Sequence, residues 1–469
     1  MQPFYSYFRQ LAICELILTS KLTTLDTLTD RIHLAVKTKN DPNIYKELYL
    51  KRKDNTILSS NIYFYRKYRH MKIGVILEGK TPPDERVPLS PKQCKEIINN
   101  YPTINLVVQK SNIRRFKDEE YANIGIELVD SVNDCDVLLG VKEVPINQLI
   151  ANKKYFYFSH TTKKQPYNRN LLKTMLDKNI TMVDYEGLTN EKGTRLIGFG
   201  KYAGIVGAYN SFYAYGKRTG DFDLKRAYLC EDRSEMEGEM SNIKLPNNYK
   251  IVTTGGGRVA SGIHEILDKL NIRKVSAKAF LEDDFNEPVY AQILVDDYYK
   301  KIDKSDFTRS DVYNNPQDFE RNFMKFAKVA DMYISGHFWD SNAPYIYTRE
   351  DAKSEDFNIK VVGDISCDID TAVASTIRPT TITEPLYGYN PQTESEVSFD
   401  DATAITVMVV DNLPCELPKD ASADFGREFI DKILPHLIND KENVIARATI
   451  CANGDLTSDH EFLRDYVNG

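Results

Sequence analysis

The sequence predicts an α/β protein built from two parallel sheets, and two observations support this class. From residue 71 onward, short apolar runs typical of strands alternate with amphipathic stretches typical of helices. One apolar run, 251–254, leads directly into three glycines and then into a helical pattern that reaches residue 267. We therefore expect two such units. Because ligand sites favour the space between domains, we expect the site in the cleft between the two units.

Composition excludes several classes of protein. The chain of 469 residues has room for two to four domains at about 100–200 residues each. Its formal net charge of −7 argues against a nucleic-acid partner. No apolar run approaches about 18 residues, so we expect no membrane span. An odd number of cysteines without a CxxC pair favours a reducing compartment, so we expect a cytoplasmic location. Seven cysteines without a CxxC pair and seven histidines without an HExxH pair argue against a metal site or a disulfide framework.

The segment 1–70 differs from the rest of the chain. It carries 12 Lys and Arg against 6 Asp and Glu, and strands and helices do not clearly alternate in it. Two interpretations fit: a basic, poorly ordered extension, or an upstream start codon with Met71 as the native start. A transit peptide is a third, and the six acidic residues count against it. We assign this segment no chemistry.

Elements of the first unit follow from apolar runs and from helix signals. Ser90 and Pro91 are typical of an N-cap and a first helical residue, so we expect a helix from there to about residue 100. Strands are expected at 72–77, 105–109, 126–129, 137–141, 155–159 and 180–185, and helices at 118–123 and 169–177. The small residues of 200–216 suit a tightly packed helix that links two domains.

The second unit repeats this rhythm around the glycine turn. A charged, irregular segment at 218–248 precedes the strand 251–254, and a helix to residue 270 follows the turn. We then expect a strand at 274–280, a polar insert to about 325, strands at 331–334 and 359–362, and a last helix from 424 to about 437.

The glycine turn has the pattern of a dinucleotide site. Gly255 permits a sharp turn, and Gly257 permits the backbone to approach a pyrophosphate. Ala260 or Gly262 permits close packing of the helix on the sheet. The N-terminus of that helix offers free N–H groups to phosphates. The competing interpretation is a glycine-rich turn that binds nothing.

Polar residues recur where apolar strands end, which is the edge at which open α/β sheets bind ligands. They are Lys142, Glu143, His160, Asp184, Glu186, Asp364, Ser366 and Asp368. Arg86, in the proline-rich loop after the first strand, could clamp a carboxylate. For each residue singly, a solvated loop position is the competing interpretation.

A Lys–His pair beside a nicotinamide suits the oxidation of a secondary amine. The nitrogen loses a proton as hydride leaves carbon, water attacks the imine, and the carbinolamine collapses, so each step needs a proton acceptor or donor. Lys142 can serve if burial or a nearby positive charge lowers its pKa, whereas an ionised Glu143 close to it would oppose this.

Nine motifs follow one another along the chain: EGKTPPDERVPLSP, GVKEVP, FSHTTKKQ, DYEG, GFGKYAGIVGAYN, TGGGRVASG, SGHFWDSNAPYIYTREDA, GDISCDID and DNLPCELP. In this set and order, over about residues 71–467, the chain resembles the lysine-forming saccharopine dehydrogenases. The resemblance is strongest to the lysine–2-oxoglutarate reductase half of the bifunctional lysine-degrading enzyme. These enzymes are relatives of alanine dehydrogenase and of the transhydrogenase α subunit.

The resemblance implies two doubly wound, Rossmann-like domains. A substrate domain comprises 71–200 and is completed by 400–469, and an NAD(P)-binding domain comprises 201–399. The implied activity is reversible interconversion of saccharopine with L-lysine and 2-oxoglutarate, with NAD or NADP as cofactor, in a stand-alone enzyme. The alternatives are an alanine-dehydrogenase-like enzyme acting on another amino or imino acid, and a dinucleotide-binding protein without catalysis. The oligomeric state stays open.

The resemblance also implies roles for individual residues. Lys142 and His160 match the catalytic pair. The substrate-binding residues are Arg86, Glu143, Glu186 and Arg195. The cofactor-binding residues are Gly255, Gly257, Arg258, Val259, Ala260, Gly262, Glu282 and Asp364. The residue at the adenosine ribose is uncertain: Glu282 is the first acid after the expected strand 274–280, Ser276 could lie nearer, and Lys278 keeps NADP open.

Overall fold

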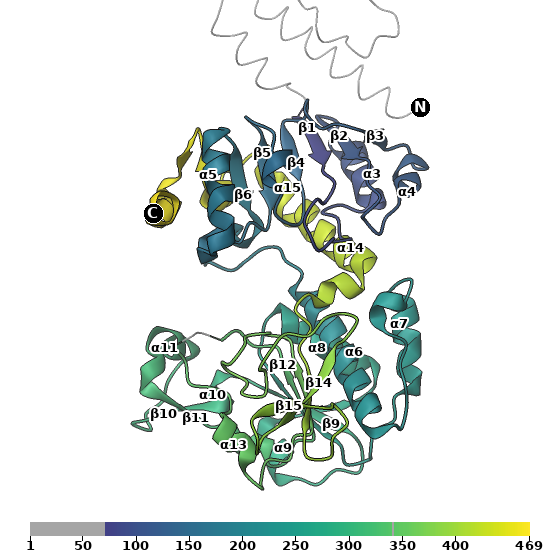
Figure 1. Cartoon of the computed structure of the whole chain (residues 1–469), viewed down its shortest axis with the longest axis vertical. Coiled ribbons are helices and arrows are strands. Elements are labelled where there is room, and N and C mark those ends of the chain that lie inside the picture. Colours follow the sequence, from purple (N-terminus) through teal and green to yellow (C-terminus); the bar gives the residue numbers. More distant parts are fainter. Residues whose placement is uncertain (1–70, 340–341) are drawn as a thin grey trace, which may run out of the picture. The chain divides into compact units, whose positions relative to one another are not determined.

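The structure, a computed structural model, describes residues 71–339 and 342–469, so the expectations for 1–70 lie outside the described residues. It contains two sheets of eight strands each, both mostly parallel (Figure 1). The α/β class with two doubly wound, Rossmann-like sheets is therefore confirmed.

The first sheet has the strand order β18-β17-β6-β5-β4-β1-β2-β3. Its strands are β1 (Met71–Val75), β2 (Ile104–Gln109), β3 (Glu127–Val129), β4 (Val137–Leu139), β5 (Lys154–Tyr157), β6 (Thr181–Asp184), β17 (Thr449–Ala452) and β18 (Asp455–Leu456). The six strands from the first part of the chain are parallel, and the C-terminal β17 joins β6 antiparallel. Neighbouring residues of β2 point to opposite cores, Leu106 to one and Val107 to the other, so both faces are covered.

The second sheet has the order β15-β14-β16-β13-β12-β7-β9-β8. Its strands are β7 (Lys250–Thr254), β8 (Arg273–Val275), β9 (Val289–Ile293), β12 (Met332–Ser335), β13 (Val361–Asp364), β14 (Leu386–Asn390), β15 (Ser395–Val397) and β16 (Ile405–Met408). Only β14 and β15 run antiparallel to their neighbours. A separate two-stranded sheet pairs β10 (Tyr299–Lys301) with β11 (Phe319–Arg321).

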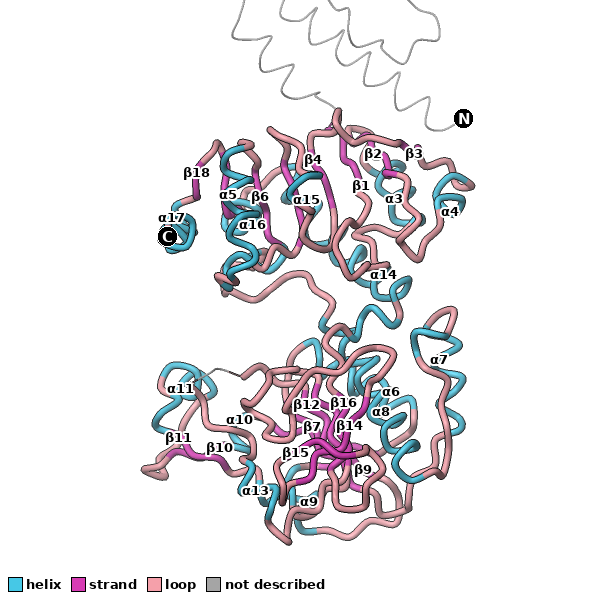
Figure 2. Tube along the Cα trace, viewed as in Figure 1, coloured by secondary structure: helices cyan, strands magenta, loops and turns pink. Residues whose placement is uncertain are grey.

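Helices surround both sheets (Figure 2). They are α3 (Pro91–Asn100), α4 (Asp118–Ala122), α5 (Arg169–Asp177), α6 (Gly200–Thr219), α7 (Arg233–Glu239), α8 (Arg258–Lys269), α9 (Ala277–Glu282), α10 (Val295–Tyr298), α11 (Arg309–Asn314), α12 (Met324–Ala327), α13 (Arg349–Lys353), α14 (Pro418–Glu428), α15 (Leu434–Ile438), α16 (Val444–Ala448) and α17 (Arg464–Asn468). Among the described residues, none of these helices is both long and apolar enough to cross a membrane.

Helix α6 packs directly against α8, the helix that follows the glycine turn. A Cβ atom on Gly204 of α6 would lie only 2.9 Å from the Ile263 nitrogen, and one on Gly262 of α8 only 2.8 Å from the Ile205 nitrogen. Two glycines thus let the helix backbones touch. Gly262 was expected to bring α8 close to the sheet, but the close contact it makes is with α6.

Three expected elements differ from the structure. The strand expected at 274–280 ends at Val275, because Ser276 caps α9 by accepting a hydrogen bond from the Ala279 N–H. The last helix begins at Pro418 rather than 424, and a π-helical segment, Phe429–Ile433, separates α14 from α15. Strand β16 pairs in the second sheet, although it lies within 400–469, the range expected to complete the first domain. The domain limits themselves stay a prediction.

Candidate functional site

One cavity of about 810 Å³ brings together residues that follow strands of both sheets. From the first sheet come Lys142 after β4 and His160 after β5, and from the second come the glycines after β7 and Ser366 after β13. The predicted residues that line this cavity are Arg86, Lys142, His160, Arg195, Gly255, Gly257, Arg258 and Val259. Of the polar residues predicted at strand ends, Lys142, His160 and Ser366 line this cavity.

The charged residues that line this cavity are all basic. They are Arg86, Lys142, Arg195, Arg258 and Arg309. Asp and Glu are absent from the described residues that line it. A cavity of this kind suits ligands that carry several negative charges.

Lys142 is held through its backbone by a carboxyl group that the sequence analysis missed. The Val141 and Lys142 N–H groups donate to the two oxygens of Glu78 at 2.6 and 3.0 Å. Burial, with the negative charge of Asp84, raises the pKa of Glu78 to about 8. Burial also lowers the pKa of Lys142, and the charge of Arg86 adds to this. Lys142 thereby moves toward the range in which an amine can act as a base.

His160 is oriented by Glu143. Its Nδ1 lies 2.8 Å from Glu143 Oε1, and Lys80 donates to the other carboxylate oxygen at 2.7 Å. Burial alone would raise the pKa of Glu143, but these two hydrogen bonds outweigh it and lower the pKa to about 2. An ionised carboxylate only accepts, so Nδ1 carries the proton and Nε2 remains for a ligand.

The backbone around His160 is fixed by Asp184, at the end of β6. The Ser159 N–H donates to Asp184 Oδ2 at 3.1 Å, and the Ser159 hydroxyl donates to the same oxygen. The Glu186 N–H donates to Oδ1 at 2.8 Å. One buried carboxylate therefore joins the loop of His160 to the loop of Glu186.

Arg86 is buried rather than solvated. Its Nε and Nη2 donate to the two oxygens of Asp84 at 3.0 and 2.6 Å, and its guanidinium lies 4.2 Å from the ring centroid of Phe199. Burial opposes ionisation of Asp84, but the charge of Arg86 prevails and lowers the Asp84 pKa to about 2. The pair is a bidentate ion pair, and Arg86 also lines the cavity, where it can meet a carboxylate.

Arg195 and Glu186 were predicted to bind substrate. Arg195 lines the cavity, whereas Glu186 does not. Glu186 lies 3.7 Å from the Arg195 guanidinium and 3.8 Å from the Lys163 ammonium. Its carboxylate thus lies beside one basic residue of the cavity lining, Arg195.

The glycine turn fits a pyrophosphate. Gly255 has a φ of +102°, and a Cβ there would lie 2.6 Å from the Gly336 carbonyl carbon, so only glycine fits without strain. The described part of the chain places nothing within 4 Å of a Cβ on Gly257. Gly257 precedes the first turn of α8, whose N–H groups lack intrahelical partners. The open space and these donors fit a phosphate group.

Arg258 and Ala260 differ in what they contact. The Arg258 guanidinium lies 3.1 Å from a Glu428 carboxylate oxygen and donates to the Arg195 carbonyl at 2.9 Å. It therefore joins the start of α8 to α14. Ala260 is buried, and its nitrogen lies 3.3 Å from where a Cβ of Gly336 would stand, so this residue packs at the end of β12.

Four predicted cofactor residues lie outside the cavity lining: Ala260, Gly262, Glu282 and Asp364. Glu282 ends α9, and its exposed side chain lies 3.8 Å from Lys278, because the strand that was to carry it ends at Val275. Asp364 is fully buried; it accepts hydrogen bonds from the Ser335, Ser366 and Thr376 hydroxyls. Asp364 thus positions its loop, and Ser366 reaches the cavity.

Three further residues, Lys80, Glu78 and Asp84, support His160, Lys142 and Arg86 and were not predicted from the sequence. Glu78 directly follows the first expected strand, so the strand-end rule could have found it. Lys80 and Asp84 lie further along the loop, so the strand-end rule does not indicate them. The path of the loop in the folded chain decides which residues they contact. The described residues contain no group of three or more His, Cys, Asp or Glu able to hold a metal ion.

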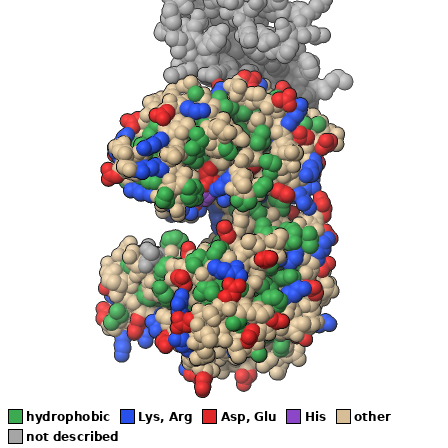
Figure 3. Space-filling view, viewed as in Figure 1, with side chains coloured by type: hydrophobic (Ala, Val, Ile, Leu, Met, Phe, Trp, Pro, Cys, Tyr) green, Lys and Arg blue, Asp and Glu red, His purple; other side chains and the backbone are tan. Residues whose placement is uncertain are grey.

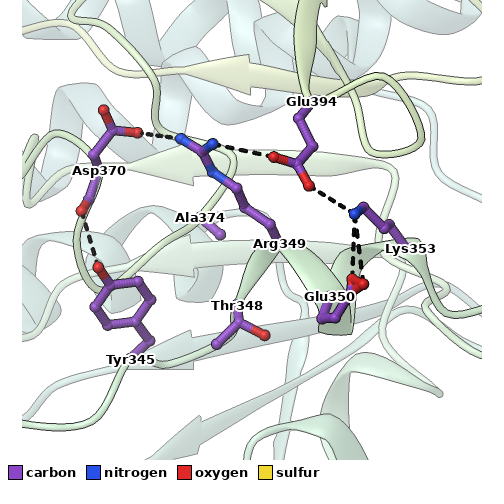
Figure 4. A pocket seen from close by; sticks show the side chains of 8 residues that line it. All are labelled: Tyr345, Thr348, Arg349, Glu350, Lys353, Asp370, Ala374 and Glu394. Carbon is purple, nitrogen blue, oxygen red and sulfur yellow. Dashed lines mark hydrogen bonds and ion pairs between the residues drawn. The ribbon is translucent and has the colours of Figure 1, made fainter.

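A second cavity of about 610 Å³ lies in the part of the chain that holds the second sheet (Figure 4). Its charged residues pair with one another. Arg349 lies 2.8 Å from Asp370 and 3.1 Å from Glu394, and Lys353 lies 2.6 Å from Glu394 and 3.2 Å from Glu350. These pairs join α13, the loop after β13 and the β14–β15 hairpin, which is a structural role. Across the face drawn in Figure 3, basic and acidic side chains are likewise interspersed.

Comparisons with known proteins show what the whole chain is similar to. The family model for the alanine dehydrogenase/PNT N-terminal domain matches residues 74–206. An alpha-aminoadipic semialdehyde synthase of Arabidopsis thaliana is 27% identical over 83% of this chain and 41% of its own length. Its mitochondrial namesake in Mus musculus is 27% identical over 81% and 46%. The chain thus spans less than half the length of these relatives.

A shorter relative matches this chain over nearly all of the relative's own length. The saccharopine dehydrogenase [NAD(+), L-lysine-forming] of Neurospora crassa is 24% identical over 78% of this chain and 91% of its own length. The predicted resemblance is confirmed. A solved L-alanine dehydrogenase shares the fold, with a TM-score of 0.56 and 16% identity over 84% of this chain and 100% of its own.

Proposed function

We propose that this protein is an NAD(P)-dependent oxidoreductase that interconverts saccharopine with L-lysine and 2-oxoglutarate. One observation carries the proposal: a single cavity holds the glycine turn, Lys142 and His160, together with four arginines, and none of the described residues that line it is acidic. The resemblance to the saccharopine dehydrogenases supports the choice of reaction. Saccharopine carries three carboxylates and the cofactor carries phosphates, so a basic lining fits both.

Residues in different parts of the cavity have different roles in this reaction. A nicotinamide held in this cavity would supply the acceptor for the hydride that leaves the carbon next to the secondary amine. Lys142, with its lowered pKa, is the base that removes the proton from that nitrogen. His160 presents Nε2 to the water that attacks the imine, because Glu143 holds Nδ1. Arg86 and Arg195 hold substrate carboxylates, and Gly255 to Val259 hold the pyrophosphate.

A substrate panel tests the proposal. Purified protein is given NADH or NADPH with 2-oxoglutarate and either L-lysine or ammonia, and oxidation of the reduced nicotinamide is followed. Lysine should support turnover and ammonia should not. A further reaction replaces 2-oxoglutarate by pyruvate in the presence of ammonia. Turnover there, and none with lysine, would favour an alanine-dehydrogenase-like enzyme, the second candidate, which the shared fold supports.

The cellular location stays a prediction. The cytoplasm was expected from the sequence, whereas relatives in Mus musculus and Rattus norvegicus bear the word mitochondrial in their names. Fractionation of cells that express the protein with a C-terminal tag would decide between the two.

A further inference from the structure

The segment 195–199 contributes to the cavity lining, and a side chain of the second sheet's helices holds its backbone. Arg195, Gly198 and Phe199 line the cavity, and the segment leads directly into α6. The Arg195 carbonyl accepts a hydrogen bond from Nη2 of Arg258, the first residue of α8, at 2.9 Å. The place of the Arg195 guanidinium in the cavity therefore depends on what fixes the backbone of this segment.

Glu428, the last residue of α14, joins this segment to α8. Its Oε2 accepts a hydrogen bond from the Gly198 N–H at 3.2 Å and another from Arg258 Nη1 at 3.1 Å. Its Oε1 accepts one from Lys432 Nζ at 2.7 Å, and Lys432 also donates to the Leu196 carbonyl at 3.3 Å. The Glu428 side chain is only 20% exposed, so these charge-assisted hydrogen bonds are partly shielded from water.

Helix α14 also holds the end of the segment through an aromatic contact. The rings of Phe199 and Phe425 are stacked, with centroids 4.5 Å apart and planes 7° apart. The guanidinium of Arg86 lies 4.2 Å from the centroid of the same Phe199 ring. The two arginines that are proposed to hold substrate carboxylates, Arg86 and Arg195, therefore both depend on this segment.

The backbone and the side chain of Arg258 face different parts of the cavity. Its backbone belongs to the first turn of α8, where N–H groups are free for a pyrophosphate. Its guanidinium lies against the segment: a Cβ on Gly198 would be 3.4 Å from Arg258 Nη1. Arg258 thus connects the place of the cofactor with the backbone that carries Arg195.

We propose that Glu428 and the Arg258 side chain are a positioning pair, which fixes Arg195 relative to the glycine turn and so sets the separation of substrate and dinucleotide. The inference rests on the proposed function, in which Arg195 holds a substrate carboxylate. Hydride transfer requires reacting atoms about 3–3.5 Å apart, so a shift of this segment impairs both binding and alignment. Glu428 itself contacts no ligand in this role.

Steady-state kinetics of saccharopine oxidation by the full-length chain, with NAD⁺ and with NADP⁺, test the pair. Glu428→Ala should raise the KM of saccharopine about 10-fold and lower kcat about 10-fold, whereas calorimetry should find the Kd of NADH and NADPH changed less than about threefold. Glu428→Gln should recover part of the loss, because its carbonyl oxygen can still accept from Gly198 and Arg258. A variant that loses substrate and cofactor binding alike, without recovery by Gln, would contradict a positioning role.

Asp431→Ala is the matched control. Asp431 lies three residues after Glu428, pairs with the exposed Arg427 at 2.8 Å and does not line the cavity. It removes the same charge from the same part of the chain, so its kinetic constants should equal those of wild type. A loss as large as that of Glu428→Ala would show an effect of charge alone and overturn the inference.

A double-variant cycle tests whether the two residues act together. Arg258→Met should raise the KM of saccharopine as Glu428→Ala does, and the double variant should be no worse than the more impaired single variant. If Arg258→Met instead weakens NADH and NADPH and leaves the KM of saccharopine unchanged, its side chain contacts the cofactor and the inference is wrong. Additive losses would also refute the pair.

Hydrogen exchange gives a result that does not depend on the substrate. In the chain without ligand, amides of the segment 195–199 should exchange at least about 10-fold faster in Glu428→Ala than in wild type or Asp431→Ala, because Gly198 loses its acceptor. Equal exchange would overturn the inference. If wild type fails to oxidise saccharopine, the proposed function is refuted, and the exchange rates still decide whether Glu428 holds the segment. If saccharopine is oxidised with the same KM by Glu428→Ala and wild type, the positioning pair is refuted and the proposed function stands.

Discussion

Replacing Gly262 by Ala would place a methyl group where α8 touches α6. The new Cβ would lie 2.8 Å from the Ile205 nitrogen and 3.0 Å from the Lys201 carbonyl carbon. Ordinary contacts between such atoms are near 3.5 Å or longer, so the helices must separate by roughly 1 Å. Overpacking of this kind costs about 1–3 kcal/mol, and the better helix propensity of Ala returns about 1 kcal/mol at most. We expect a net loss of about 1–2 kcal/mol.

Chemical denaturation measures this loss, and a second glycine is a matched control. Gly238 lies within α7. A Cβ atom added to Gly238 would meet no other described residue within 4 Å outside its own turn of helix. Gly238→Ala should therefore leave the free energy of unfolding unchanged or raise it by about 0.5–1 kcal/mol. NADPH should also bind Gly262→Ala more weakly, because the displaced helix starts at the glycine turn. A Gly262→Ala protein as stable as Gly238→Ala would refute the claimed backbone contact.

Three further predictions concern the charged residues. Lys142→Met should lower turnover about 10²- to 10⁴-fold while calorimetry finds NADPH affinity unchanged; undiminished turnover would remove Lys142 from the mechanism. Arg86→Met should lower the free energy of unfolding by about 3–5 kcal/mol, because it leaves the buried carboxylate of Asp84 unpaired; adding Asp84→Asn should recover part of the loss, and an additive double variant would argue against the pair. The lowered pKa of Glu143, from 4.5 to about 2, stabilises the fold by about 3 kcal/mol above pH 4.5, and this is lost as the pH falls toward 2. Denaturation of wild type and Glu143→Gln should therefore give curves that converge at acid pH, and a constant difference would contradict the pKa.

Local patterns predicted much of the fold and the part of the cavity lining that carries Lys142, His160 and the glycine turn. Lys142 and His160 each follow a buried strand, and parallel strands bring their carboxyl ends to one edge, so their convergence could be expected. The glycine turn was recognisable because Gly255 needs a conformation that other residues avoid. These inferences depend on residues close together in the sequence.

What was missed depends on contacts between distant segments. Sequence order suggested that the strand after α8 lies beside β7, but β9 lies between them, so Glu282 does not follow the strand next to β7. The helix that Gly262 contacts is α6, some 60 residues earlier, and nothing in the sequence near Gly262 indicates this contact. Glu78 supports Lys142 from 64 residues away. Such pairings are set by the packing of whole elements.

The central claim is that hydride passes between a nicotinamide and the carbon that joins lysine to the glutaryl group. The most direct measurement supplies NADPH and NADH deuterated at the transferable position, with L-lysine and 2-oxoglutarate, and analyses the product by mass spectrometry. We predict one compound that contains both carbon skeletons, with one deuterium on the glutaryl carbon next to the secondary amine. Deuterium in glutamate or in another single amino acid, or no transfer from either cofactor, would contradict the account.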